Sequence, residues 1–244
     1  MVQYYLRHYF DPDFDYLRPK PGDSADGKSD LYSLGYVQNV IAGQLLAEII
    51  PLEKWETEPD PRFVLNKPEL PAGANTRVDP AYPNYLLSDA NGYVFYNEGK
   101  ITVKRLLNVR QDVSFRTGNI FFVGDMAIHG SVRSGFSVQA NNLRIMGMVE
   151  GGVARARRDL MVDGGARGGA GQHCLLDAGD KLLTPFLEKI EARARGNMVV
   201  DKYCLYSTVY AGANLVVRER LYGSTINAYG SVYVGKQLGN KAAV

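Results

Sequence analysis

Three aspartates in the second half of the chain, Asp125, Asp159 and Asp180, have a residue type and a regular spacing that could serve sugar chemistry. Glycoside hydrolysis needs two carboxyl groups about 5 to 10 Å apart, one acting as acid and the other as nucleophile or base. Asn and Ser share the same series of positions, however, and Asp and Asn are ordinary turn residues whose side chains bond nearby backbone. We therefore favour a structural role and assign no catalytic residue. A carbohydrate-active β-helix enzyme is kept as an alternative.

A second pattern places arginines in pairs. The segment Ala154-Arg-Ala-Arg157 recurs as Ala192-Arg-Ala-Arg195, and both share one phase of a sequence repeat. In a strand, alternation puts the alanines inward and the arginines outward, so both segments present one exterior face that could bind an acidic partner or phosphates. The candidate partner-binding arginines are Arg155, Arg157, Arg193 and Arg195. An anion or nucleic-acid binder that uses this face is a third hypothesis. Residues 150 to 220 hold 11 basic and 9 acidic groups, and this small excess of positive charge does not favour nucleic acid.

Tyrosines crowd the last part of the chain and suit a protein interface. They are Tyr203, Tyr206, Tyr210, Tyr222, Tyr229 and Tyr233. Among them we select Tyr206, Tyr222 and Tyr233 as candidate partner-binding residues, with self-association as one expected use. Packing against another part of the same chain is the alternative.

Histidines and cysteines add no further chemistry. His8, His129 and His173 are far apart in the sequence, and no Cys/His spacing matches a metal site. We expect neither a metal nor a cofactor. Cys204 falls in an apolar series and should be a small buried side chain, whereas a disulfide to Cys174 is the less favoured alternative.

A 17-residue repeat must position these groups. It is marked by Asp, Asn or Ser at Asp125, Asn142, Asp159, Asp180, Asn197, Asn214 and Ser231, whose sequence numbers differ in turn by 17, 17, 21, 17, 17 and 17. The third position after each mark is apolar in all seven units: Ile128, Ile145, Val162, Leu183, Val200, Val217 and Val234. So is the seventh: Val132, Val149, Ala166, Leu187, Cys204, Leu221 and Leu238. Short repeats of this kind stack into a solenoid, each burying the face of its neighbour.

Alternation around each mark predicts short strands, and units of this length are too short to hold a helix. We therefore predict an all-β protein built on a right-handed parallel β-helix with about 17 residues per coil, since parallel crossovers favour the right hand. Gly124, Gly179, Gly196 and Gly230 precede marks directly, which suggests corners with positive φ. The long interval places four extra residues within 164 to 174, most simply a loop that leaves the stack. This stretch lacks the Gly-Lys-Ser/Thr ending of a phosphate-binding loop.

The first hundred residues show no such repeat. Turn chemistry separates short strand patterns, including Asn91–Tyr96 and Lys100–Lys104 with a turn at Asn97–Gly99. Gln44–Pro51 fits a strand or a short helix. We predict a small β-rich domain over residues 1–100 that caps the β-helix of residues 101–244, because an open solenoid end exposes unpaired backbone.

Composition places the chain in an ordinary class of protein. The net charge of +2 gives no electrostatic case for a membrane or nucleic acid. The first residues lack an apolar signal segment, the apolar stretch near Val37–Pro51 is interrupted by polar residues, and two cysteines suit a reducing compartment. We expect a cytoplasmic protein with no membrane insertion.

Several stretches resemble the flagellar assembly protein A (FapA) family, and the resemblance covers nearly the whole chain. They are residues 34–51 (LGYVQNVIAGQLLAEIIP), 117–132 (TGNIFFVGDMAIHGSV), 147–152 (GMVEGG), 164–165 (GG) and 201–212 (DKYCLYSTVYAG). The resemblance implies a right-handed β-helix behind an N-terminal β domain, in cytoplasmic bacterial proteins linked to flagella or to polymer-like scaffolds. It brings no catalytic residues. The family favours Ala-Gly-Gly-Asp before a mark, where this chain has Ala156-Arg-Arg-Asp159.

Together these features predict a non-enzymatic scaffold that mediates protein–protein assembly, with a link to flagellar assembly or polar organisation. The expected partners are proteins, including a second copy of the chain.

Overall fold

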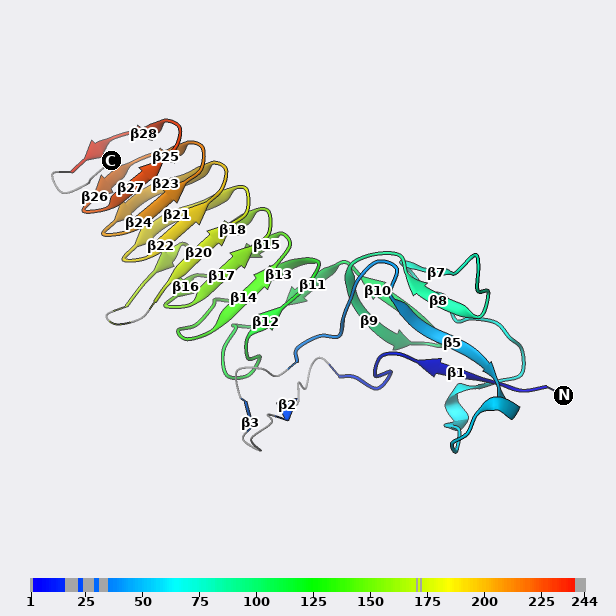
Figure 1. The fold of residues 1–244 in the computed structure, drawn as a ribbon. Helices are drawn as coiled ribbons and strands as arrows, with labels where there is room; N and C mark the ends of the chain where they lie inside the picture. The colour runs from blue at the N-terminus through cyan, green and yellow to red at the C-terminus, as the bar shows by residue number, and fades with distance from the viewer. Residues whose placement is uncertain are drawn as a thin grey trace. The chain divides into compact units, whose positions relative to one another are not determined.

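The computed structural model describes residues 2–15, 22–23, 29–30, 35–169, 171 and 173–239. Its contacts divide the chain into two units, Met1–Arg18 with Val37–Arg105, and Pro19–Tyr36 with Leu106–Val244. The division follows Arg105 because β10 (Lys100–Lys104) pairs along its whole length with β9 (Gly92–Asn97) in the first unit (Figure 1).

The N-terminal unit is β-rich. Its five-stranded sheet has the order β6 (Val64–Leu65), β1 (Tyr4–His8), β5 (Leu45–Pro51), β8 (Tyr85–Ser88) and β7 (Thr76–Val78). Its three-stranded sheet has the order β10, β9 and β4 (Asn39–Val40), and two 3-10 helices, η1 (Leu52–Lys54) and η2 (Pro61–Phe63), follow β5. The open choice for Gln44–Pro51 is resolved as strand β5, which pairs antiparallel with both β1 and β8. The expected turn joins β9 to β10, with positive φ at Glu98 and Gly99 as a two-residue hairpin requires.

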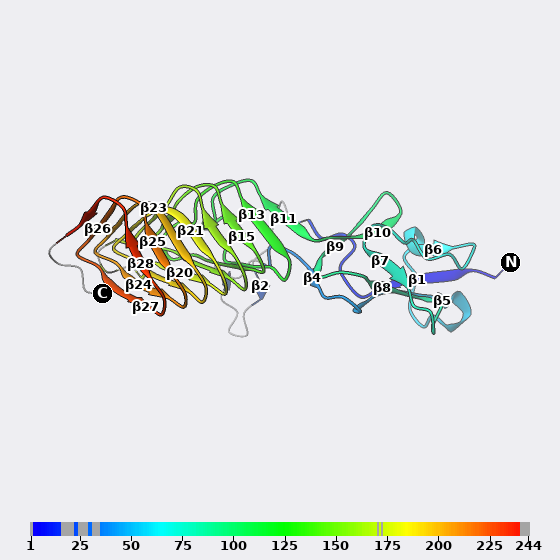
Figure 2. The ribbon, with the colours of Figure 1, turned by 90° about the horizontal axis from the view of Figure 1, so that it is seen from above.

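Parallel strands stack coil upon coil in the second unit, which is a β-solenoid (Figures 1 and 2). One sheet follows the order β11 (Leu106–Val109), β13 (Asp125–Ile128), β15 (Leu143–Ile145), β18 (Leu160–Val162), β21 (Leu182–Glu188), β23 (Met198–Leu205), β25 (Leu215–Val217) and β28 (Val232–Val234). Attached to it are β16 (Val149–Glu150), β19 (Ala166–Arg167), β26 (Arg220–Tyr222) and β29 (Gln237–Leu238), twelve strands in all.

The opposite sheet has seven strands: β12 (Ile120–Phe121), β14 (Ser137–Ala140), β17 (Val153–Ala156), β20 (Leu175–Ala178), β22 (Glu191–Ala194), β24 (Thr208–Ala211) and β27 (Thr225–Ala228). A further pair, β2 (Gly22–Asp23) and β3 (Ser29–Asp30), is antiparallel. The predicted class is confirmed: the protein is all-β, with a parallel β-helix and a β-rich N-terminal unit.

The two predicted apolar columns line the inside of the coils, with the exception of Leu183. The seventh-position residues from Val132 to Leu221 are all fully buried, including Cys204, and successive members pair coil to coil. Leu238, in the last described coil, is 59% exposed because no described coil stacks on it. Each coil therefore buries the core residues of its neighbour, as the repeat predicts.

The register around Asp180 differs from the prediction. Leu160 pairs with Leu182, one position later than the long interval between marks predicts, and Leu182 pairs with Met198, one position earlier than a regular coil would place it. Lys181 therefore takes the mark position, and Asp180 lies one residue before it. As a result Thr184, not Leu183, fills the third-position core site and pairs with Val200.

The irregular spacing around Asp180 thus combines an insertion before this residue with a deletion after it. The insertion of five residues appears between Arg167 and Leu175, since Val153 pairs with Leu175, five positions beyond its partner in a regular coil. The deletion falls between Thr184 and Phe186, where the register of β21 against β23 shifts at Pro185. The predicted loop is also shorter than expected, because Ala166–Arg167 forms β19 inside the stack. Two positions of the predicted loop, 170 and 172, lie outside the described residues.

The glycines before the marks serve a different purpose from the one predicted. Gly124, Gly179, Gly196 and Gly230 all lie outside the positive-φ region. A Cβ at Gly179 would collide with the carbonyl oxygen of Arg157 in the preceding coil. Gly179, Gly196 and Gly230 therefore allow the close approach of two coils and are not needed for positive φ.

Candidate partner-binding surfaces of the solenoid

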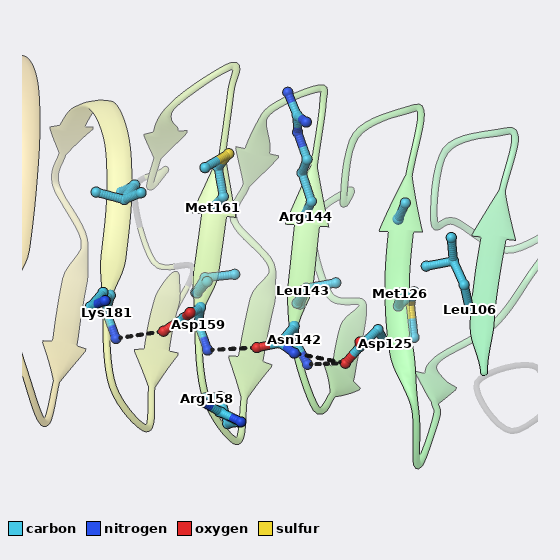
Figure 3. Close-up of a pocket in the computed structure, with 13 residues that line it drawn as sticks. Leu106, Asp125, Met126, Asn142, Leu143, Arg144, Arg158, Asp159, Met161 and Lys181 are labelled. Carbon is cyan, nitrogen blue, oxygen red and sulfur yellow. Dashed lines mark hydrogen bonds between the residues drawn. The ribbon is translucent and has the colours of Figure 1, made fainter. Parts of the chain in front are cut away.

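The marks form a ladder of hydrogen bonds along the solenoid. The Oδ1 atom of Asp125 accepts the backbone N–H of Asn142 at 3.0 Å, and the Oδ1 of Asn142 accepts that of Asp159 at 3.3 Å. Asp159 in turn accepts the N–H of Lys181 at 3.3 Å (Figure 3). Lys181 offers no acceptor, so the ladder stops and resumes at Asn197, which accepts the N–H of Asn214 at 3.1 Å.

This ladder explains why the repeat uses Asp, Asn and Ser. A short side chain that carries an oxygen can reach the next coil, which satisfies a corner N–H that the strands leave unpaired. Asp125 and Asp159 are therefore structural acceptors, separated by Asn142 (Figure 3). The expected third carboxylate, Asp180, stands outside the ladder. The geometry gives no pair of free carboxylates facing one another among these marks.

The arginines project from the seven-stranded sheet as the alternation predicts. Ala154, Ala156, Ala192 and Ala194 are buried. Register places Arg155 beside Asp177, and Asp177 beside Arg193, so the two arginines occupy one outer column two coils apart. The column continues to Tyr210. Asp177 was not predicted as part of this face, and its carboxylate interrupts the positive charge.

Arg193 is held by its neighbours. Its guanidinium forms an ion pair with Glu191 at 2.5 Å and lies over the Tyr210 ring, 5.7 Å from the centroid. The hydrogen bond to Glu191 raises the pKa of Arg193. Arg155, in contrast, is exposed and has no ion pair within the part of the chain that the structure describes.

Arg157 and Arg195 lie one step along the same face. The backbone N–H of Arg157 pairs with Ala140, and that of Arg195 with Ala178, so the two occupy equivalent corners two coils apart. Arg157 takes a corner where the family pattern has glycine, yet its φ lies outside the positive region. The arrangement leaves Arg157 and Arg195 exposed, so both can contact a partner.

The three selected tyrosines do not form one cluster. Tyr206 and Tyr222 lie in neighbouring coils and meet edge to face, with centroids 5.6 Å apart. Tyr206 has a φ of 50°, an uncommon conformation for a bulky side chain. Tyr233 occupies another column of the twelve-stranded sheet, beside Val216, and is 60% exposed.

Tyr233 ends a column of outward side chains that was not predicted from the sequence. This outer column of the twelve-stranded sheet runs through Ala127, Arg144, Met161, Leu183, Val199, Val216 and Tyr233, each paired with the next. The sequence signal is the second position after each mark. With the mark at Asp180, the second position falls on Leu182 and the column is not recognised. With the correct mark, Lys181, it falls on Leu183, which faces outward.

A hollow of about 550 Å³ lies where this column meets the ladder of marks (Figure 3). Leu106, Ala127, Met161 and Leu183 supply its apolar side chains. Charged groups surround them, including Arg144, which forms an ion pair with Asp163 at 2.9 Å.

The remaining reactive groups are dispersed. Both cysteines are free and buried, and burial raises the pKa of the Cys204 thiol to about 11. His129 is exposed, and His173 lies 3.6 Å from Glu191. Within the described ranges, no group of three or more His, Cys, Asp or Glu side chains could hold a metal ion. None of the helices in the described residues is long and apolar enough to cross a membrane.

Comparison with known families agrees with this architecture. The model of the Flagellar Assembly Protein A beta solenoid domain matches residues 105–244. The chain belongs to the Flagellar Assembly Protein A family. This membership supports a role related to flagellar assembly. The matched range begins one residue before β11, so it covers the solenoid of this family member. Searches of curated proteins and of solved structures returned no match.

Proposed function

We propose that the protein is a non-enzymatic cytoplasmic scaffold that binds protein partners during flagellar assembly. The observation that carries the proposal is the solenoid itself, in which polar side chains form coil-to-coil bonds while regular outer columns face solvent. The marks that resemble catalytic carboxylates act as backbone acceptors. What remains accessible is a set of long, regular surfaces, which suit binding of other chains.

The arginine face and the tyrosines are the proposed contact residues. Arg155, Arg157 and Arg195 present exposed guanidinium groups that can pair with acidic side chains of a partner. An anion or nucleic-acid binder is less well supported, because Asp177 lies between Arg155 and Arg193. Tyr206 adds an exposed ring at a strained corner, a feature that is often retained for function.

The role is tested by an in-frame deletion in the source cell, with flagella counted by electron microscopy. We expect fewer flagella per cell and recovery with the wild-type gene. The variant Arg155→Glu/Arg193→Glu should restore flagella less well than Arg110→Glu/Arg116→Glu, a control with the same change in charge at exposed positions outside this face. Unchanged flagellation after the deletion would refute the role.

Self-association is tested separately by light scattering on a size-exclusion column at several concentrations. A molar mass that rises with concentration would support assembly of copies, and Tyr222→Ser and Tyr233→Ser should then reduce it. A strict monomer would leave a different protein as the partner.

A further inference from the structure

An apolar strip crosses the outside of the solenoid. It is formed by Met161, Leu183, Val199, Val216 and Tyr233, called the outer strip below. The first four side chains alternate with buried core residues along their strands, so they point away from the core, and Tyr233 continues their column in the last coil. Val199 and Val216 remain partly accessible, and Tyr233 is 60% exposed.

Over most of their length, two other outer columns of the same solenoid carry polar or charged side chains, whereas the outer strip has none over its five strands. The equivalent column on the seven-stranded sheet contains Gln139, Arg155, Asp177, Arg193, Tyr210 and Asn227. The column beyond the seventh-position core residues alternates in charge through Arg133, Glu150, Arg167 and Glu188 before it ends in Leu205 and Tyr222. An apolar run over five neighbouring strands is therefore a local feature, of the kind that marks an interaction site.

The dimensions of the outer strip limit what can cover it. Five strands at about 4.8 Å spacing span roughly 19 Å, the length of about 13 residues of α-helix. Polar columns lie about 6.6 Å to either side, so the apolar width is roughly 13 Å, close to the diameter of a helix with its side chains. The shape matches one helix lying along the solenoid.

The backbone chemistry favours a helix over an extended peptide. β18, β21, β23 and β25 each pair with a strand on both sides, so their sheet face offers no free N–H or C=O. An extended peptide laid on this face would leave its own backbone unpaired, whereas a helix satisfies its backbone internally.

A second copy fits less well. The strip supplies about 250 Å² (roughly 19 Å by 13 Å), against about 800 Å² per partner in a typical stable complex. Ion pairs border it, Arg144 with Asp163 and Arg218 with Asp201. A broad sheet-to-sheet contact would cover these charges, and their desolvation is costly.

We propose that the outer strip is a docking site for one amphipathic helix of a partner protein. The helix lies along the solenoid axis and places apolar residues at positions i, i+3 or i+4, and i+7 on Val199 and its neighbours, with its polar flank over Asn197 and Asn214. The inference rests on the proposed scaffold function and gives it a specific binding mode.

The test uses the purified chain and a phage-displayed library of helical peptides, each about four turns long, with one randomised face. The strip variant is Val199→Lys/Val216→Lys. Its matched control is Gln139→Lys/Asn227→Lys, which adds the same charge at outward positions of the opposite sheet. We expect enriched peptides to carry the helical apolar spacing and to bind the control like the wild type. They should lose roughly tenfold or more in affinity for the strip variant.

A second variant, Val199→Thr/Val216→Thr, keeps the branched side-chain shape and should show a smaller loss in the same direction. The proposal falls if no peptide is enriched, or if enriched peptides bind the strip variant as tightly as the wild type. It also falls if light scattering shows a wild-type dimer that the strip variant dissociates, because the occupant is then a second copy. The deletion phenotype is independent of these results, so the scaffold role can stand when the helix site fails.

Discussion

Replacing Asp125 by Ala is the most direct test of the ladder of marks. The Oδ1 atom of Asp125 accepts three N–H donors: the Asn141 amide at 2.9 Å, the Asn142 backbone at 3.0 Å and the Asn142 amide at 2.9 Å. A net contribution near 1 kcal/mol for each bond, reduced by replacement with water at this half-buried site, gives a loss of about 2 kcal/mol. Asp125→Asn keeps the acceptor oxygen and should cost less.

The matched control is Asp180→Ala. Asp180 belongs to the sequence repeat but lies one residue before the ladder position, and its carboxylate has no hydrogen bond to any side chain or backbone group that the structure describes. Its replacement should change the free energy of unfolding by less than about 0.5 kcal/mol.

Two measurements read the difference. In urea, a loss of about 2 kcal/mol with an m-value near 2 kcal/mol/M lowers the unfolding midpoint by about 1 M. Hydrogen exchange at the backbone N–H of Asn142 should accelerate by about 30-fold in Asp125→Ala, since that N–H loses its acceptor. Equal losses for the Asp125 and Asp180 variants, or a loss below about 0.5 kcal/mol at Asp125, would refute the ladder as a source of stability.

Three further predictions concern single residues. Since burial raises the pKa of Cys204 to about 11, its thiol should react with a chromogenic disulfide reagent only after unfolding, and rapid reaction of the native protein would contradict that burial. Gly179→Ala should lower the free energy of unfolding in urea by about 3 kcal/mol, because the added Cβ collides with the preceding coil. Gly171→Ala, at a glycine with a φ of 76° and open space around it, should lower it by about 1 kcal/mol. The reverse order would refute the close-approach explanation. Burial lowers the pKa of His8 from 6.5 to about 4, so the folded state favours the neutral ring. The N-terminal unit should therefore keep its stability above pH 6.5 and lose it as the pH falls towards 4. Fluorescence of Trp55, the single tryptophan, reports this unit, and a pH dependence that persists in His8→Phe would exclude His8 as the cause.

The solenoid was predictable from the sequence because its core positions repeat in every unit. The register near Asp180 was not, since Leu182 and Leu183 are both apolar and either could face the core. Only pairing with Leu160 and Met198 decides between them. A one-residue shift reverses the side-chain direction, so this ambiguity also hid the outer strip.

The surfaces were predicted unevenly for similar reasons. The phase of Arg155 and Arg193 was predictable because buried alanines alternate with them, and it is confirmed. Their binding role stays a prediction. Asp177 was missed because the insertion separates it in sequence from Arg155, its neighbour in space. The glycine corners were misread because glycine serves both positive φ and close packing, and the sequence does not distinguish these uses.

The persistence of the columns through the five-residue insertion and the one-residue deletion at Pro185 has an evolutionary consequence. Because strand pairing resumes at Leu175 after the insertion and at Phe186 after the deletion, the columns continue in phase on both sides. Whole coils can therefore be duplicated or lost without exchanging inside and outside. Lineages can lengthen or shorten such a protein in steps of about 4.8 Å, and the reach of its outer surfaces changes in the same discrete steps.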